Sequence, residues 1–198
     1  MTLEIPRGSF AVLQGPSGSG KTTLLNLIGC IDHPSSGTIL VEGCDVAGLT
    51  DDALSRFRLT KLGFIFQNFN LIPVLSAVEN IEYPLLLQRV PKPEARARAL
   101  AMAAAVGLGE ASDQRPSELS GGQCQRVAIG RSLVASPPLV IADEPTANLD
   151  VATGREIIDL MLQMRDRTGT TFVISTHDPA IAAMAGLCFT IRDGLLLP

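Results

Sequence analysis

Eight residues near the start of the chain, GPSGSGKT from Gly15 to Thr22, fit the spacing G-x-x-x-x-G-K-[ST] at every fixed position. An apolar run (10–14) precedes them and a helix-like segment (21–29) follows. Glycines let successive backbone N–H groups turn inward, and a helix N-terminus adds partial positive charge. This context predicts a phosphate-binding loop rather than a plain glycine-rich turn, with Lys21 on the β- and γ-phosphates and the Thr22 hydroxyl on Mg²⁺.

A second magnesium anchor is offered by LVIADEP, in which residues 139–142 form an expected buried strand and Asp143 stands at its end. There the Asp143 carboxylate could hold Mg²⁺ through water. The next residue, Glu144, could polarise a water molecule toward a γ-phosphate, which is the task of a general base. An exposed acidic strand end is the alternative, and the phosphate-binding loop makes it the weaker one.

Two further polar residues close predicted strands: Gln67 ends GFIFQ (63–67), and His177 follows TTFVIST (170–176). The carboxyl ends of strands are where open α/β sheets bind ligands. We therefore expect Gln67 to sense magnesium and the attacking water, and His177 to hydrogen-bond the γ-phosphate and orient Glu144. Taken singly, each residue is more readily explained as a structural cap.

The stretch LSGGQ (119–123) has a second anion-binding shape, far from the first in the sequence. It opens a helix-like segment, so Ser120, Gly121 and Gly122 present a hydroxyl and free N–H groups. If the pocket around the first loop is already complete, this turn is expected to hold the γ-phosphate of another copy. Two copies head to tail would then bury two ATP molecules between them, and hydrolysis would let them part.

Short apolar runs alternate with helix-like segments over most of the chain. The expected strands are 10–14, 37–43, 63–67, 138–143, 170–176 and 188–196, and the expected helices include 21–29, 151–166 and 178–185. From 73 to 136 the sequence predicts helices alone. It therefore indicates a single α/β domain of the P-loop NTPase fold, with a RecA-like parallel core sheet from 1–72 and 137–198 and an inserted α-helical subdomain at 73–136.

The composition disfavours several classes of protein. The chain is 46% hydrophobic and 18% charged with a net charge of −4, which argues against disorder and against nucleic acid as a partner. No Trp and a single Tyr leave no stacking platform for bases. The four cysteines are too widely spaced for a metal knuckle and fit a reduced, cytoplasmic setting. No apolar run is long enough to cross a bilayer, and the N-terminus has no signal-peptide pattern.

Five motifs occur in a fixed order: GPSGSGKT, the glutamine of FIFQ, LSGGQ, VIADEPTANLD and STHD. Together they resemble the nucleotide-binding domain of an ATP-binding cassette (ABC) transporter, over nearly the whole chain. Residues 15–37 and 62–87 further resemble the subfamily for lipoprotein release and macrolide-type efflux. The resemblance implies an ATP-hydrolysing subunit that energises a membrane transporter. It also implies a homodimer around ATP, on the cytoplasmic face of the membrane against an integral membrane permease, with no nucleic acid.

The same resemblance implies roles for individual residues, with ATP and Mg²⁺ as cofactors. Glu144 would be the general base, His177 the switch histidine and Lys21 a further catalytic residue, while Thr22, Gln67 and Asp143 would serve the metal. The nucleotide would bind to Gly15, Pro16, Ser17, Gly18, Ser19, Gly20, Lys21, Thr22, Thr23, Gln67 and Asp143 of one copy and to Ser120, Gly121, Gly122 and Gln123 of the other.

Three other segments also match the family. Asp150, which ends the stretch ANLD, matches the loop that communicates between the two sites. Residues 68–80 and 114–118 resemble segments that face the membrane subunit, and plain surface loops are the alternative.

The chain departs from the family pattern in three ways. A strand pair with an adenine-stacking aromatic residue is expected before the phosphate loop, yet the sole aromatic residue there is Phe10, within a predicted strand. We therefore expect weaker ATP binding and an exposed sheet edge. Cys124, at the start of a helix, indicates an inert thiol or, less readily, a redox-sensitive thiol with a lowered pKa. Gly130, inside a helix, has no evident functional reason.

Two other functions stay open at this level. A soluble ABC ATPase outside transport, acting in DNA repair or on ribosomes, would usually carry long insertions or paired cassettes, and this sequence has neither. An inactive regulatory cassette would follow if the departures before Gly15 abolish activity.

Overall fold

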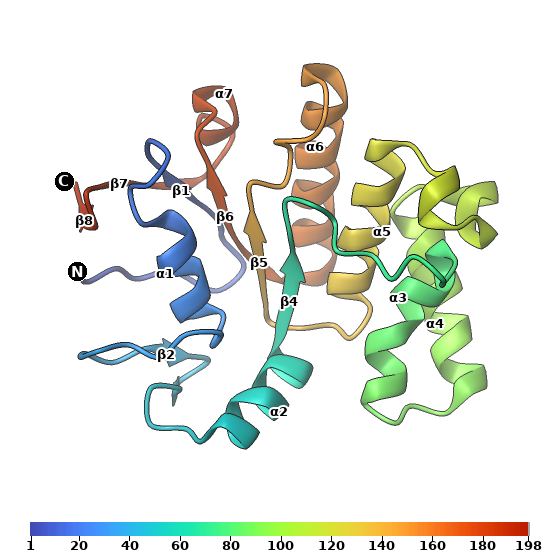
Figure 1. Ribbon diagram of the computed structural model, residues 1–198, viewed down its shortest axis with the longest axis horizontal. Helices are drawn as coiled ribbons and strands as arrows, with labels where there is room; N and C mark the ends of the chain where they lie inside the picture. Colours follow the sequence, from blue (N-terminus) through green and yellow to red (C-terminus); the bar gives the residue numbers. More distant parts are fainter. Residues whose placement is uncertain (198) are drawn as a thin grey trace.

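The computed structural model describes residues 1–197, which form a six-stranded sheet with helices on both faces and a small separate hairpin (Figure 1). The strands lie in the order β4-β5-β6-β1-β7-β8, and all neighbours are parallel except β7 and β8. Their bounds are β1 (Phe10–Gln14), β4 (Leu62–Ile65), β5 (Leu139–Asp143), β6 (Thr171–Thr176), β7 (Leu187–Arg192) and β8 (Leu195–Leu196). The predicted P-loop NTPase fold with a parallel core sheet is confirmed.

Alternate residues of the central strands point into two separate cores, one on each face of the sheet. On β1, Phe10 and Val12 belong to one core, Ala11 and Leu13 belong to the other, and all four are almost fully buried. Every residue of β6 is buried as well. Because a strand covered on both faces needs a nearly continuous apolar run, these strands are recognisable in the sequence.

Helices cover both faces of the sheet. α1 (Lys21–Ile28) contacts β5 and β6 beside one core, and α6 (Val151–Thr168) buries its apolar stripe in the other. The short α7 (Pro179–Ala182) contacts β1 and β6, and α2 (Asp51–Lys61) contacts β4. Because α1 directly follows the loop after β1, its contact with β5 brings that loop to the strand that Asp143 ends.

Residues 73–136 contain no strand and hold three helices and two 3₁₀ turns. These are α3 (Ala77–Leu87), α4 (Lys92–Ala105), η1 (Gly109–Asp113), η2 (Pro116–Glu118) and α5 (Gly121–Leu133). In Figure 1 the three helices gather on the side of the molecule opposite the two chain ends. Across residues 1–197, no helix combines the length and apolar character needed to cross a membrane.

Gly130 has a packing reason that the sequence does not reveal. A Cβ at this position would lie 2.9 Å from Cδ1 of Ile81 on α3 and 3.5 Å from Cγ of Met102 on α4. Helix α5 therefore approaches Ile81 of α3 more closely than a side chain would permit, while the distance to Met102 of α4 is that of an ordinary contact. This close packing offsets the cost of about 1 kcal/mol that a glycine brings to a helix interior.

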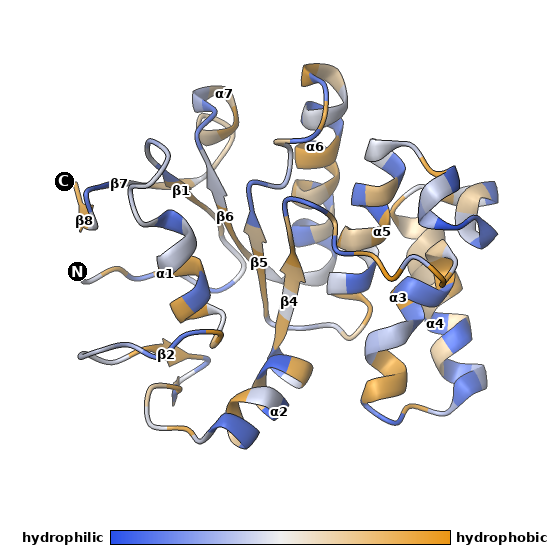
Figure 2. Cartoon of the chain, viewed as in Figure 1, coloured by the Kyte–Doolittle hydropathy of each residue, from blue (hydrophilic) through white to orange (hydrophobic). Residues whose placement is uncertain are grey.

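The expected elements differ from the structure at three places. The strand expected at 37–43 is reduced to β2 (Leu40–Val41), which pairs with β3 (Cys44–Asp45) apart from the main sheet. Helix α2 shows little amphipathic periodicity in the sequence, because it buries only Leu54. Figure 2 shows hydrophilic and hydrophobic residues mixed along α2, whereas strands β4 and β5 are mainly hydrophobic. Strand β4 ends at Ile65, so Gln67 lies in the following turn and not at a strand end.

Candidate functional site

The loop between β1 and α1 has the curvature of an anion-binding loop. Gly18 and Gly20 take φ angles of +77° and +104°, which residues with a side chain rarely adopt. Gly15 has no room for a side chain, because a Cβ there would lie 2.1 Å from the carbonyl oxygen of Ile191. Helix α1 begins at Lys21 without a side-chain cap, so the N–H groups of its first turn stay available to an anion.

Lys21 is buried, with 6% of its surface exposed, and its ammonium forms a long ion pair with the Glu144 carboxylate. Nζ donates to the carbonyl oxygens of Gly15 (2.8 Å) and Pro16 (3.0 Å) within the loop itself, and lies 3.9 Å from Oε1 of Glu144. A buried cation is costly unless an opposite charge lies near it. A phosphate group in the loop would supply that charge and replace the two carbonyl oxygens.

Asp143, the last residue of β5, lies against the first turn of α1. Oγ1 of Thr22 is 3.3 and 3.1 Å from the two carboxylate oxygens of Asp143. Ser175 donates to Oδ1 of Asp143 at 2.5 Å and accepts the N–H of Glu144 at 2.9 Å. The sequence reasoning gave Ser175 no role, although this residue opens the STHD motif as a polar residue inside an apolar strand. The register of β5 and β6 pairs it with Asp143.

Glu144 directly follows β5 in a left-handed backbone conformation. Its φ angle is +45°, which costs on the order of 1–2 kcal/mol for a residue with a side chain. Oε2 of Glu144 lies 3.0 Å from Nδ1 of His177, and Oε1 faces Lys21. The side chain of Glu144 is 18% exposed and that of His177 is 66% exposed. The structure thus places Glu144 between the loop lysine and the histidine, with one edge open to solvent.

These residues fit a nucleotide phosphate and a magnesium ion. The available N–H groups and the buried Lys21 suit an anion, and the oxygens of Thr22 and Asp143 are the hard donors that Mg²⁺ prefers. No group of three or more His, Cys, Asp or Glu side chains in residues 1–197 could hold a metal by itself. The remaining ligands of a magnesium ion here would therefore be water and phosphate oxygens.

Gln67 lies in an exposed turn, and in residues 1–197 no hydrogen bond joins its side chain to Thr22 or Asp143. Its carbonyl oxygen accepts from Nδ2 of Asn148 at 2.9 Å. Arg131 of α5 holds the next residues, because its guanidinium donates to the carbonyl oxygens of the two residues at 69 and 70, at 2.7 and 2.5 Å. The turn is thus tied by its backbone to the loop after β5 and to α5.

The Ser120 turn lies apart from this cluster. In residues 1–197 no hydrogen bond or ion pair joins it to the phosphate loop or to the end of β5. Oγ of Ser120 accepts the N–H of Gln123 (3.2 Å), and the N–H of Ser120 donates to Oε1 of Gln123 (2.8 Å). The hydroxyl and one N–H that the sequence suggested were free are therefore paired locally. Gly122 is packed tightly, since a Cβ there would lie 2.7 Å from Cγ2 of Thr153.

Two residues beside these loops have shifted pKa values. Cys124 is 7% exposed and burial raises the pKa of its thiol, so the lowered pKa expected for a redox-sensitive thiol is wrong, which favours the alternative of an inert thiol. Asp150 caps α6 by accepting the N–H groups of Ala152 and Thr153. The hydroxyl of Thr153, followed by these N–H groups, lowers the pKa of the Asp150 carboxyl.

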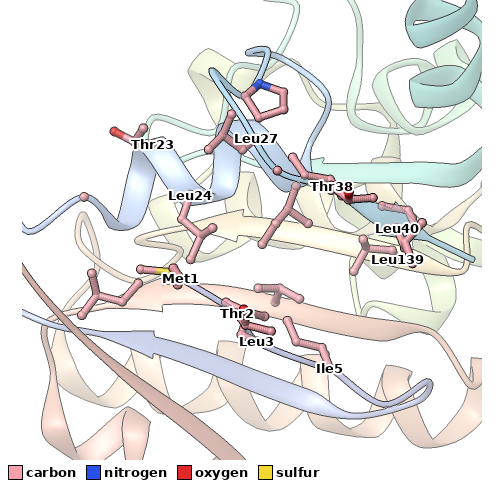
Figure 3. A pocket seen from close by; sticks show the side chains of 18 of the residues that line it. Met1, Thr2, Leu3, Ile5, Thr23, Leu24, Leu27, Thr38, Leu40 and Leu139 are labelled. Atoms are coloured by element: carbon pink, nitrogen blue, oxygen red, sulfur yellow. The ribbon is translucent and has the colours of Figure 1, made fainter. Parts of the chain in front are cut away.

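A cavity of about 1120 Å³ opens beside the phosphate loop, between the N-terminal segment, α1 and β2 (Figure 3). Leu3, Leu24 and Leu40 are among the side chains that line it, and none of its lining residues in the described chain is aromatic. Phe10 is 1% exposed and packs on Phe172 with ring centroids 5.9 Å apart, so its ring is not available to a base. The expected weaker binding of ATP stays a prediction.

Comparison with known proteins identifies relatives over the whole chain. Residues 1–147 match the family model described as ABC transporter. The chain is 47% identical over 200 residues to the macrolide export ATP-binding/permease protein of Syntrophobacter fumaroxidans. This alignment covers 100% of this chain and 28% of that protein. It is 42% identical over 198 residues to the lipoprotein-releasing system ATP-binding protein of Bordetella pertussis, covering 100% of this chain and 86% of that protein.

Two solved structures share the fold. An ATP-binding cassette of Methanocaldococcus jannaschii, a dimer in a post-hydrolysis state bound to ADP and Pi, gives a TM-score of 0.89 at 42% identity, over 99% of this chain and 86% of that chain. A component of an ABC transporter complex of Clostridium perfringens gives a TM-score of 0.92 at 30% identity, over 100% of this chain and 79% of that chain.

Proposed function

Because the chain belongs to the ABC transporter family, we propose that it hydrolyses MgATP at the cluster around Lys21 and Glu144, in a site completed by a second copy. In doing so it energises a membrane transporter of the lipoprotein-release or macrolide-export type. The observation that carries this proposal is the position of Glu144, whose carboxylate faces both Lys21 and His177 at the end of β5.

Each residue of the cluster has a task that follows from its place. The loop amides and Lys21 would bind the β- and γ-phosphates. Thr22 and Asp143 would hold Mg²⁺, with Gln67 sensing it, and the bound metal neutralises charge on the phosphate oxygens. Glu144 would accept a proton from a water molecule in line with the γ-phosphate. His177 would hold the Glu144 carboxylate and meet the γ-phosphate.

The separation of the Ser120 turn from its own cluster supports a site built from two copies. The turn opens helix α5, whose first N–H groups suit an anion, and in residues 1–197 no hydrogen bond or ion pair joins it to the phosphate loop of its own chain. The dimeric, ADP- and Pi-bound state of the Methanocaldococcus relative supports the same arrangement here. Ser120, Gly121, Gly122 and Gln123 of one copy would then face the γ-phosphate held by the other.

Removal of the Thr22 hydroxyl tests the metal-dependent part of this function. Thr22→Val keeps the shape of the side chain but loses the oxygen that lies 3.1 Å from Asp143. We expect hydrolysis to need about tenfold more Mg²⁺ for half its maximal rate, because one hard donor is lost. Phosphate release measured at a series of Mg²⁺ concentrations checks this, and a sample with EDTA gives the rate without magnesium. Thr22→Ser should behave as wild type, and an unchanged Mg²⁺ dependence in Thr22→Val would contradict the metal assignment.

A groove of about 420 Å³ between α2, β4 and the helices α3 and α5 is the proposed docking site for the membrane subunit. Its walls include Ile31, Phe66 and Leu87, and Ile31 and Leu87 are 45% and 51% exposed. Exposed apolar side chains around a hollow mark an interaction surface. The groove also reaches Asn70, within the segment 68–80 that resembles a region facing the membrane subunit. We propose a cytoplasmic helix of the permease, with an apolar face, as its occupant.

Leu87→Glu is expected to weaken binding to the permease while leaving ATP hydrolysis by the isolated chain unchanged. A carboxylate in a contact between apolar surfaces would cost on the order of 2 kcal/mol, or about thirtyfold in affinity. Co-purification with the permease and ATPase activity of the complex measure this. Leu100→Glu is the matched control, because Leu100 is similarly exposed (46%) on α4 and lies outside the groove. Equal loss of binding in both variants would contradict the assignment.

This function is preferred to the two alternatives on specific grounds. A relative that joins an ATP-binding part and a permease in one protein supports transport rather than DNA repair or ribosome work. The contacts among Thr22, Asp143, Glu144 and His177 argue against an inactive cassette, because a chain without turnover has no need of them. In this role the chain would sit peripherally on the cytoplasmic face of the membrane.

A further inference from the structure

Gln125 is a polar side chain at a core position of α5. It is 0% exposed, among apolar neighbours on the same helix such as Val127 and Ala128. Its Nε2 donates to the carbonyl oxygen of Pro145 at 2.7 Å. In the described part of the chain its Oε1 has no hydrogen-bond partner. A buried amide oxygen without a partner costs about 1–3 kcal/mol, which offsets the stability that the hydrogen bond to Pro145 provides.

The hydrogen bond from Gln125 to Pro145 lies directly beside Glu144, the residue of the site with a strained backbone. Glu144 holds a φ angle of +45°, and such a conformation persists only where its surroundings fix it. On its amino side, the N–H of Glu144 donates to Oγ of Ser175. On its carboxyl side, the carbonyl oxygen of the following residue, Pro145, accepts from Nε2 of Gln125. The backbone of Glu144 is therefore fixed from β6 on one side and from α5 on the other.

We propose that Gln125 is a positioning residue that keeps the Glu144 carboxylate aligned for proton transfer, and this inference rests on the proposed function. The geometry gives it a second consequence. Gln125 lies five residues after Ser120 on one helix, a rise of about 7.5 Å. The turn that grips a partner's phosphate and the side chain that holds the chain's own base thus belong to one rigid element.

Contacts beside the Ser120 turn strengthen this connection. A Cβ on Gly121 would lie 3.2 Å from Cδ2 of Leu149, and Gly122 is packed against Thr153. The start of α5 and the loop that follows Glu144 therefore lie in direct contact. A phosphate bound at the Ser120 turn in a dimer would press on this loop, and Gln125 would carry the displacement to Pro145. Occupancy of one site would in this way set the alignment of the base in the other.

The test replaces the amide by apolar side chains of similar size, in Gln125→Met and in Gln125→Leu. We expect kcat for ATP to fall about tenfold or more, because a small misplacement of a general base is costly, while KM and the affinity for ATP stay within about twofold. The melting temperature should change little, because the variants remove the unpaired Oε1 but also leave the carbonyl oxygen of Pro145 without its donor, and these two effects oppose one another. Ser132→Ala is the matched control. It deletes another buried polar group of α5, whose hydroxyl donates only within its own helix, to Ile129, and its kcat should equal that of wild type.

The outcomes separate this inference from the proposed function. A wild-type chain that hydrolyses no ATP would overturn the function itself. A wild-type kcat in both Gln125 variants would overturn the positioning role and leave the function standing. A lower kcat that comes with an equally large loss of thermal stability or of ATP affinity would also overturn it, because a structural role alone accounts for that pattern.

Discussion

Glu144→Gln is expected to lower ATP hydrolysis about a hundredfold or more while ATP binding is retained, because the amide cannot accept the proton of the attacking water. The substitution keeps the size of the side chain and its contact with His177. ATP that is bound but not cleaved would hold two copies together, so the variant should form a dimer that depends on ATP. Phosphate release and the molar mass in solution, measured with and without MgATP, check both parts.

Glu110→Gln is a suitable control for this experiment. Glu110 is an exposed acid on η1 with no part in the cluster, so its variant should hydrolyse ATP at the wild-type rate. A Glu144→Gln protein that turns over ATP at a normal rate would show that another group takes the proton. One that stays monomeric in MgATP at high concentration would instead contradict the shared site.

Ser120→Arg should abolish hydrolysis about as completely, although Ser120 touches nothing in the cluster of its own chain. A bulky cation at the turn removes the capping hydroxyl and blocks the approach of a partner's γ-phosphate. The effect on rate is expected to reach about a hundredfold, the cost of losing oxyanion-type donors. The affinity of the single chain for ATP should stay within about twofold, since the phosphate loop is intact. Nucleotide titration measures the affinity for ATP, and steady-state kinetics measure the rate of hydrolysis. The two together show whether the rate falls while the affinity is kept.

Combining Ser120→Arg with Glu144→Gln tests the role of Ser120 in dimerisation directly. In a Glu144→Gln background, Ser120→Arg should prevent the ATP-dependent dimer. Ser55→Arg places the same charge on an exposed serine of α2 and should leave dimerisation and hydrolysis unchanged. If Ser120→Arg lost ATP binding in the monomer, the turn would belong to its own chain's site and the two-copy arrangement would be wrong.

Much of the fold could be predicted because its central strands are covered on both faces. Burial on two sides demands runs such as FAVLQ and LVIAD, and the glycine pattern between β1 and α1 is set by backbone angles and by the lack of space at Gly15. The reduced strand at β2 and the helix α2 could not be predicted equally well. Both lie at the surface, where α2 buries a single residue and gives little periodic signal.

The same contrast applies to the site. Residues that a motif marks, such as Lys21, Asp143 and Glu144, meet where strand ends and the phosphate loop come together. The motifs do not reveal which residues hold them in place, even though Ser175 opens the STHD motif. Ser175 and Gln125 are ordinary polar residues in apolar surroundings, and their partners are decided by strand register and by helix packing. Both depend on contacts between segments distant in the sequence, which local patterns do not encode.

The reciprocal cap between Ser120 and Gln123 has a consequence for the working cycle of the protein. In a single copy each of these side chains accepts the backbone N–H of the other residue. The turn is therefore expected to bind free anions only weakly. Pairing exchanges these local bonds for bonds to a shared nucleotide, and such an exchange changes the free energy only modestly. Once phosphate leaves, the cap can close again at once. Separation of the two copies therefore costs little free energy, which suits an ATPase that must associate and dissociate in every cycle.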